Sequence, residues 1–270
     1  MTIQEKLDLL RNNLQKLDGL IVAFSGGVDS TFLLSVAKEV LGDRVTAITA
    51  RSSTYPEREY LESVKYAAQM GVNHVIIESE ELDVEGFSQN PINRCYLCKN
   101  ELYTKIKSFA YSLGVNHIAD GSNLDDINDY RPGMIATKEQ GVLSPLKEAY
   151  FTKEDIRILS KASNLPTWDK PAFACLSSRF PYGQQITREA LNRVDQAEQF
   201  LMDLGLRQVR VRDYGDLARI EVNPAERKFF FDERIMDEVH DAFVGFGYRY
   251  ITLDLKGYRT GSMNESLELK

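Results

Sequence analysis

The sequence predicts an α/β protein with a parallel twisted sheet and helices on both faces, followed by a small α+β domain. Short apolar runs alternate with helical patterns up to about residue 163, which is typical of a parallel sheet covered by helices. From Thr187 the pattern changes to helix, strand, strand, helix and strand. We therefore expect one domain over residues 1–185 and a second over residues 186–270.

The first domain is expected to begin with a helix and a strand. Leucines at helical spacing predict a helix over 4–16, and the apolar run Leu20–Phe24 predicts the first strand. Further strands are expected at 45–50, 75–78 and 115–119, and helices at 31–41, 57–70 and 99–113. The word Gly-Val-Asn-His occurs at 71–74 and at 114–117, where a helix ends and a strand begins. Its glycine suits a helix C-cap, and its histidine is interpreted as a turn residue.

The rest of the chain contains one non-periodic stretch. Thr152–Asp155 resembles a capping box that opens a helix running to about Ser163. Residues 164–185 then show no periodicity and include Pro166, Trp168, Pro171, Cys175 and Pro181. The expected elements of the second domain are a helix at 187–204, strands at 207–212 and 217–222, a helix at 224–244 and a strand at 248–254.

Composition limits the class of protein. The chain has 270 residues and 43% hydrophobic content, enough to fill a core. A net charge of −7 and a pI near 5.2 argue against a protein that coats nucleic acid. The sequence shows no signal-peptide pattern at its start, and no apolar stretch approaches the roughly 18 residues that a membrane helix requires. We expect a cytoplasmic protein with no membrane partner.

The stretch IVAFSGGVDS at 21–30 places two glycines and two serines directly after the first apolar run. A loop that leaves the carboxyl end of a strand and enters a helix binds anions, because free N–H groups and the helix dipole point there. Glycines allow the backbone to wrap a phosphate. The residues expected to bind it are Ser25, Gly26, Gly27, Val28, Asp29 and Ser30, with Asp29 orienting amides or holding Mg²⁺.

This loop lacks the lysine of the GxxxxGK[ST] motif, which reaches the terminal phosphates. Cleavage elsewhere in a triphosphate is therefore favoured. The SGGVDS word after a first strand resembles the pyrophosphate loop (PP-loop) of the ATP pyrophosphatases, which have an adenine nucleotide alpha hydrolase-like fold. The resemblance implies ATP as cosubstrate, cleaved to AMP and pyrophosphate while a substrate is activated as its adenylate.

Other strand ends of the sheet are expected to complete the nucleotide site. Arg51 and Ser52 follow the second strand, and Gly121 follows the fourth. An acidic group of Asp125, Asp126 and Asp129 comes next, and Asp126 is our candidate ligand for Mg²⁺. Aspartate and glycine are also common turn formers, so a purely structural role for these residues stays open.

Three cysteines suggest metal or redox chemistry in a reducing compartment. Cys95 and Cys98 form a CxxC pair, and Cys175 lies far away in the sequence. Structural zinc normally takes four ligands, whereas three thiolates can hold three corners of a [4Fe–4S] cluster and leave one iron open to hydrosulfide. Spacing alone leaves open a CxxC at a helix start and one unrelated cysteine.

Arginines provide two further candidate sites for binding an anion. Arg179, four residues after Cys175, can lower a thiol pKa or steady an adenylate phosphate. Arg210 and Arg212 alternate with valines along a strand, so both point from one face and invite a phosphate. The alternative is a solvated strand face paired with Asp213, Asp216 or Glu221.

Taken together, five sequence blocks resemble the LarE family of ATP-dependent sulfur transferases. They are SGGVDS, RCYLCK, DGSNLDDINDYRPG, SPLKEAYFTKEDIR and CLSSRFPYG. The resemblance implies adenylation of a carboxylate of pyridinium-3,5-biscarboxylate mononucleotide and its conversion to a thiocarboxylate, for the nickel-pincer cofactor of lactate racemase. It further implies that Ser178, Arg210 and Arg212 grip the phosphate of this small nucleotide, and that the chain forms a homo-oligomer.

Two sulfur routes occur in this family. Some members sacrifice the sulfur of a cysteine beside the SSRFPYG block, and others carry three cysteines associated with a [4Fe–4S] cluster. The set Cys95, Cys98 and Cys175 resembles the second kind, and direct attack by Cys175 stays open.

The main alternative is a tRNA thiolase, which uses the same loop and similar cysteines. Acidic composition disfavours it, because tracking nucleic-acid phosphates needs an extended basic field. An amide-forming ATP pyrophosphatase and an AMP-sensing module that does not turn over are weaker alternatives.

Overall fold

The computed structural model describes residues 1–128, 132–259 and 261–262. Asp129 and its neighbours Tyr130 and Arg131 lie outside the described residues. The chain forms two compact units, Met1–Val84 with Asn93–Phe173, and Glu85–Ile92 with Ala174–Lys270.

This division differs from the boundary that the sequence suggests at residues 185 and 186. Residues 174–185 belong to the second unit because a short loop of that unit binds them. The side-chain amide of Asn90 donates to the carbonyls of Phe180 and Pro181, at 3.1 and 2.7 Å. The N–H of Gly183 donates to the carbonyl of Asn90 at 2.9 Å.

A four-stranded parallel sheet forms the centre of the first unit, as predicted. Its strands are β1 (Leu20–Ala23), β2 (Val45–Arg51), β3 (Asn73–Glu78) and β4 (Ile118–Ala119), in the order β3-β2-β1-β4. The chain moves outward from β1 through β2 to β3 and then returns to place β4 on the other side of β1. Ligands of open α/β sheets bind where the strand order reverses in this way, outside the carboxyl ends of the strands.

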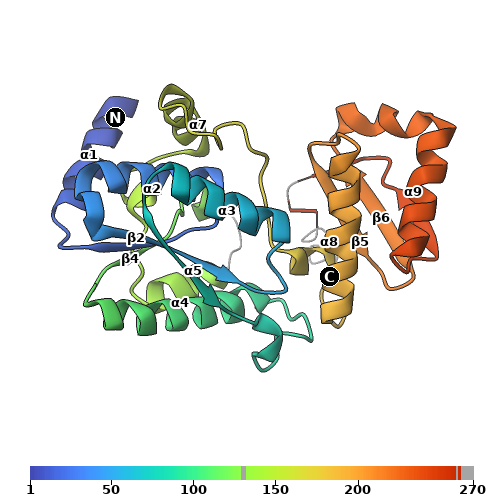
Figure 1. The fold of residues 1–270 in the computed structure, drawn as a ribbon, viewed down its shortest axis with the longest axis horizontal. Coiled ribbons are helices and arrows are strands. Elements are labelled where there is room, and N and C mark those ends of the chain that lie inside the picture. The colour runs from blue at the N-terminus through green and yellow to red at the C-terminus, as the bar shows by residue number, and fades with distance from the viewer. Residues whose placement is uncertain (129–131, 260, 263–270) are drawn as a thin grey trace. The chain divides into compact units, whose positions relative to one another are not determined.

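Helices cover both faces of this sheet (Figure 1). One layer contains α1 (Ile3–Gln15), α2 (Val28–Leu41), α3 (Glu57–Gln69) and α7 (Lys153–Ala162), and the other contains α4 (Arg94–Leu113) and α5 (Pro132–Glu139). Alternate residues of β1 pack into two hydrophobic cores, one on each face of the sheet. Leu20 and Val22 pack with α1 and α2, whereas Ile21 packs with Tyr103 and Ile106 of α4. The predicted fold class is confirmed.

The helix ends agree with the sequence patterns, whereas one histidine that was interpreted as a turn residue lies elsewhere. Thr152 forms the expected capping box with Asp155. Gly114 is the left-handed C-cap of α4, with φ +66°. His74, interpreted above as a turn residue, instead lies within β3, where its Nε2 is 2.8 Å from the Thr49 hydroxyl.

The second unit is a small mixed sheet with two helices. Its elements are α8 (Arg188–Asp203), β5 (Val209–Asp213), β6 (Leu217–Val222), η5 (Pro224–Phe231), α9 (Glu233–Gly245) and β7 (Tyr250–Leu253). β6 pairs antiparallel with β5 and parallel with β7. The single helix expected at 224–244 is wrong. Asp232 has extended backbone angles and caps α9 through the N–H of Arg234, so a 3₁₀ segment ends there and a new helix begins.

Within the described residues, every helix is too short or too polar to cross a membrane.

Candidate functional site

The SGGVDS loop joins β1 to α2 at the point where the strand order reverses. Gly26 adopts the left-handed region with φ +62°, and a Cβ there would lie 3.1 Å from the Cβ of Ser63. Gly27 is the N-cap of α2 and supplies no side-chain acceptor. The N–H groups of the first turn of this 14-residue helix are thus left for an anion, and the helix dipole favours negative charge there.

Hydroxyls and a second glycine shape the same loop. The hydroxyls of Ser25 and Ser30 are 3.1 Å apart, and the Ser30 hydroxyl also donates to the carbonyl of Gly27 at 3.3 Å. Gly121, directly after β4, packs so closely that a Cβ would lie 2.9 Å from the backbone nitrogen of Ser30. The structure thus brings the predicted residues of two strand ends together at the start of α2.

Asp29 is held beside both a cation and a second carboxylate. The Lys153 ammonium donates to Asp29 Oδ2 at 2.5 Å. Burial raises the pKa of Asp29; Lys153 opposes this shift, whereas the nearby Asp126 adds to it. Two neighbouring carboxylates at a triphosphate loop suit Mg²⁺, which is commonly bound by one or two carboxylates and substrate phosphates. Asp29 and Asp126 therefore fit the predicted metal.

The residues predicted at the end of β2 are placed differently. Arg51 is exposed, pairs with Glu57 at 3.1 Å and lies 4.8 Å from the centre of the Tyr60 ring. The Ser52 hydroxyl is 3.1 Å from that of Thr54. These contacts keep both residues at the carboxyl edge of the sheet but engage them with local partners, so nucleotide contact by either stays a prediction.

Asp120, at the end of β4, organises the sheet edge beyond the loop. It accepts hydrogen bonds from Tyr103, Ser122 and Ser144 at 2.8 to 3.1 Å, and the Lys99 ammonium lies 3.3 Å away. Burial would raise its pKa, but Lys99 and these donors lower it, so Asp120 is a carboxylate.

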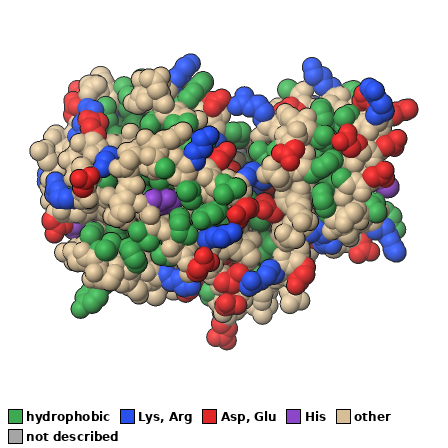
Figure 2. All heavy atoms as spheres, viewed as in Figure 1, with side chains coloured by type: hydrophobic (Ala, Val, Ile, Leu, Met, Phe, Trp, Pro, Cys, Tyr) green, Lys and Arg blue, Asp and Glu red, His purple; other side chains and the backbone are tan. Residues whose placement is uncertain are grey.

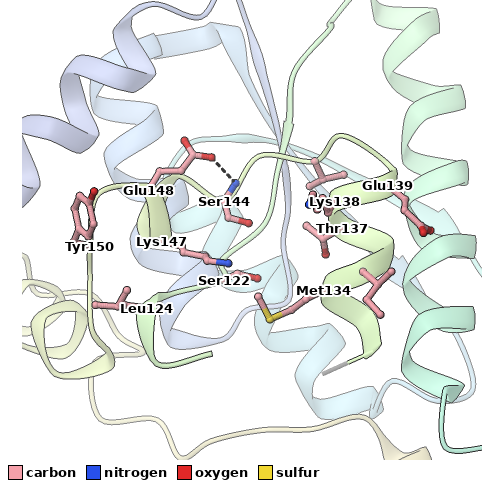
Figure 3. Close-up of a pocket in the computed structure, with 12 residues that line it drawn as sticks. Ser122, Leu124, Met134, Thr137, Lys138, Glu139, Ser144, Lys147, Glu148 and Tyr150 are labelled. Atoms are coloured by element: carbon pink, nitrogen blue, oxygen red, sulfur yellow. Dashed lines mark hydrogen bonds between the residues drawn. The ribbon is translucent and has the colours of Figure 1, made fainter. Parts of the chain in front are cut away.

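A pocket of about 990 Å³ lies beside Asp120, between α5 and the short helix α6 (Pro145–Glu148). Figure 3 shows Ser122, Ser144 and Lys147 on one wall, with Met134 and Thr137 of α5 opposite. Ser122 and Ser144 both donate to Asp120, so the pocket wall and the β4 end form one hydrogen-bonded unit.

The CxxC pair lies in the first turn of α4. Cys95 is exposed and Cys98 is half-buried, and neither forms a disulfide. The Cys98 thiol lies 3.8 Å from Glu81 Oε1. Among the described residues, three or more metal-binding side chains do not gather at one place. Cys175 belongs to the second unit, so a shared three-thiolate site stays a prediction.

Arg179 fixes the loop that carries Cys175. Its guanidinium is completely buried and bonds both carboxylate oxygens of Glu198, at 2.8 and 2.7 Å. Its Nη1 donates to the carbonyls of Ala174 and Cys175 and to the hydroxyl of Ser178, at 2.7 to 2.9 Å. Burial would lower the pKa of Arg179, but the charge of Glu198 and the hydrogen bonds to it raise the pKa. The predicted residues Cys175, Ser178 and Arg179 therefore form one cluster.

Arg210 and Arg212 are also buried, at 5% and 4% exposure, so their strand face is not solvated. Arg212 donates to Glu221 and to the carbonyl of Ser178, both at 2.8 Å. The Arg210 guanidinium lies 5.2 Å from the centre of the Tyr258 ring. The structure thus joins Arg212 to the cysteine loop, with Glu221 as a partner that the sequence had suggested, and Arg210 interacts electrostatically with Arg179 of that loop.

The buried arginines of this unit act on one another electrostatically. Burial and the positive charge of Arg179 lower the pKa of Arg210 to about 10, whereas the charge of Glu198 opposes this shift. A bound anion would favour the charged form of Arg210, which agrees with the phosphate site that the resemblance implies.

The chain is similar to known proteins along nearly its whole length. A family model described as NAD synthase matches residues 2–104, which include the phosphate loop. The chain is 44% identical over 265 residues to an uncharacterized protein from Synechocystis, covering 98% of this chain and 99% of that protein. It is 38% identical over 269 residues to the pyridinium-3,5-bisthiocarboxylic acid mononucleotide synthase of Lactiplantibacillus plantarum, covering 98% and 96%. A glutamine-hydrolyzing GMP synthase from Aeropyrum pernix is 24% identical over 172 residues, covering 56% and 33%.

Proposed function

The chain belongs to the LarE family, that of the pyridinium-3,5-bisthiocarboxylic acid mononucleotide synthases, and is an ATP-dependent enzyme. We propose on this premise that it adenylates a carboxylate of pyridinium-3,5-biscarboxylate mononucleotide and replaces one carboxylate oxygen with sulfur. The observation that carries the proposal is the glycine-shaped loop at the start of α2, with open N–H groups at the reversal point of the sheet.

The first unit supplies the activation step. The loop holds the phosphates of ATP, with Asp29 and Asp126 as the carboxylates for Mg²⁺, which neutralises phosphate charge when bound. A carboxylate oxygen of the substrate attacks the α-phosphorus and pyrophosphate leaves. Lys153, which now pairs with Asp29, is placed to contact the departing phosphates. The product of this step is a mixed anhydride whose leaving group is AMP.

The second unit binds the phosphate of the substrate and carries the loop that contains Cys175. Arg210, Arg212 and Ser178 hold the phosphate of the pyridinium nucleotide, and the burial of both arginines and the hydrogen bond from Arg212 to the Ser178 carbonyl support this role. Arg179 acts on Cys175 through the main chain, and a contact with the adenylate stays a prediction. Sulfur then attacks the acyl carbon and AMP departs with the carboxylate oxygen.

The sulfur route is proposed to use all three cysteines. Cys95 and Cys98 lie three residues apart on one helix, and these two cysteines and Cys175 form no disulfide. This donor set fits a [4Fe–4S] cluster, which supplies an exchangeable sulfide when bound. Iron and acid-labile sulfide in anaerobically purified protein test this assignment. A protein that takes up no iron and turns over once would instead support donation by Cys175 itself.

Incubation of the protein with ATP, Mg²⁺, sulfide and the biscarboxylate nucleotide tests the proposed reaction. We expect AMP, pyrophosphate and thiocarboxylate to form together, measured by mass spectrometry and phosphate analysis. ADP as the product would reject the proposal. Release of AMP and pyrophosphate without a sulfur-containing product would reject the sulfur transfer and retain the activation step.

The distribution of charged side chains on the surface bears on the alternative that the chain is a tRNA thiolase. On the face drawn in Figure 2, basic and acidic side chains are interspersed and do not gather into one basic field. Salt-sensitive retention of bulk tRNA in a filter-binding assay would favour the tRNA thiolase. The homo-oligomer and the cytoplasmic location implied above stay predictions.

Replacing Gly121 by alanine is expected to weaken ATP binding about tenfold or more, because the new Cβ would stand 2.9 Å from the backbone nitrogen of Ser30. Relieving this clash must move the first turn of α2 or the end of β4. Isothermal titration calorimetry measures the effect. Gly245→Ala is the matched control, since a Cβ at Gly245 meets open space. Equal ATP affinity in the two variants would contradict close packing at the loop.

A further inference from the structure

Residues 165–173, which lead toward Cys175 in the chain, contact the phosphate loop directly through Lys170 and indirectly through Tyr55. The Lys170 ammonium donates to the carbonyl of Gly26 at 3.2 Å. The Tyr55 hydroxyl donates to the carbonyl of Ser25 at 2.8 Å, and the Tyr55 ring meets Phe173 edge-on, with ring centres 6.5 Å apart. The segment therefore holds the Gly26 carbonyl directly, and it contacts the tyrosine that holds the Ser25 carbonyl.

These carbonyl contacts set the direction of the amides that face the anion. In a trans peptide the C=O and the following N–H point in opposite directions. Holding the Ser25 carbonyl thus orients the N–H of Gly26, and holding the Gly26 carbonyl orients the N–H of Gly27. Conversely, a phosphate that rotates either peptide pulls on Tyr55 or Lys170.

Lys170 also neutralises two carboxylates close to the loop. It lies 2.7 Å from Glu59, whose side chain is 6% exposed, and 2.5 Å from Glu62. Burial would lower the pKa of Lys170, but the charges of Glu59 and Glu62 outweigh burial and raise it. Arg58 also contacts Glu59, at the longer distance of 3.8 Å. Without Lys170, a buried negative charge would stand near the site for a triphosphate.

The same segment is anchored to the rest of the first unit. Arg157 of α7 donates to the main-chain carbonyls of Trp168 and Lys170, at 2.6 and 2.7 Å. Phe173 is the last residue of the first unit, and Cys175 follows two residues later in the chain. Lys170 is therefore connected to the cysteine by a short segment with defined contacts.

We propose that Lys170 is a positioning residue, which sets the amides of the phosphate loop through the Gly26 carbonyl and couples nucleotide occupancy to the segment before Cys175. The inference rests on the proposed use of ATP at this loop and adds a residue to it. Nucleotide binding, and not sulfur chemistry, is the event that Lys170 senses.

Trp168 makes the coupling measurable, because it is the single tryptophan of the chain and lies two residues before Lys170. Its fluorescence is followed while the α,β-methylene analogue of ATP, which resists cleavage to AMP, is added with Mg²⁺. We expect a saturable change in the unmodified protein. In Lys170→Met the Kd should rise about tenfold or more, and the fluorescence change should be lost at saturation. Lys65→Met, an exposed lysine of α3, is the charge-matched control and should behave as the unmodified protein.

A double variant distinguishes the loss of the Lys170 charge from the loss of its contact with the Gly26 carbonyl. It also shows whether a weaker affinity in Lys170→Met results from misfolding. Adding Glu59→Gln to Lys170→Met removes the buried carboxylate that Lys170 had neutralised, so affinity for the analogue should return to within about threefold of the original. The fluorescence change should stay absent, because the contact with Gly26 is still missing. A full response in either Lys170 variant, or no response in the unmodified protein, would overturn the proposal. The assay contains neither pyridinium nucleotide nor sulfide, so its outcome is independent of whether the chain transfers sulfur.

Discussion

Replacing Cys175 by serine is expected to reduce thiocarboxylate formation by more than about a thousandfold while ATP binding is unchanged. A hydroxyl provides no sulfur and is a poor iron ligand, so the change removes the reactive group in either sulfur route. It should cost little structure, because the loop is held through the Cys175 carbonyl, which accepts from the Ser178 N–H and hydroxyl at 3.1 and 2.9 Å. Product is measured by mass spectrometry and ATP binding by calorimetry. Thiolation at the original rate would show that Cys175 has been given the wrong role.

Cys95→Ser is the matched control that separates the two sulfur routes. Cys95 is exposed, so its replacement disturbs little packing. If a cluster delivers sulfur, as we propose, this variant should lose iron, acid-labile sulfide and thiolation together. If Cys175 is sacrificed, Cys95→Ser should stay active for one turnover and leave Cys175 without its sulfur. The second result would reject the cluster and retain the proposed reaction.

The phosphate loop could be predicted from the sequence because its determinants are local. Its strand, its glycines and the first turn of α2 fall within residues 20–31, and backbone geometry alone decides where their N–H groups point. The parallel sheet was predictable for a similar reason, since each unit of strand and helix has its own periodicity. The pair of arginines on one face of a strand could also be identified, because successive side chains of a strand always point to opposite faces.

The supporting charges could not be predicted in this way because their partners are remote in the chain. Lys153 pairs with Asp29 across 124 positions, and Lys170 pairs with Glu62 across 108. Lys153 was visible only as a member of a capping box, and Lys170 only as part of a non-periodic stretch. Glu198 looked like an ordinary residue of an amphipathic helix, although it is completely buried. Tertiary packing decides these roles.

Replacing Glu198 by glutamine is expected to destabilise the second unit by about 3–5 kcal/mol, the usual cost of removing one partner from a buried ion pair. Glu198 accepts two hydrogen bonds from Arg179 and one from the N–H of Val211, at 2.7 to 2.9 Å. Glutamine has nearly the same shape but no charge, so the completely buried Arg179 would lose its counter-ion. The charge of Arg179 already lowers the pKa of Arg210, whereas Glu198 raises it, and the variant would leave two buried cations facing each other.

Urea unfolding followed by circular dichroism measures this loss, with the two units fitted as separate transitions. Only the transition of the second unit should move, and ATP affinity should be unchanged because the phosphate loop lies in the first unit. Arg179→Met combined with Glu198→Leu is the informative control, since an apolar pair of similar volume can replace a buried ion pair without loss of stability. This double variant should recover most of the folding energy yet remain inactive, because Arg179 no longer holds the carbonyl of Cys175. Wild-type stability in Glu198→Gln would contradict the charge argument, and full thiolation by the double variant would show that Arg179 does not position the cysteine loop.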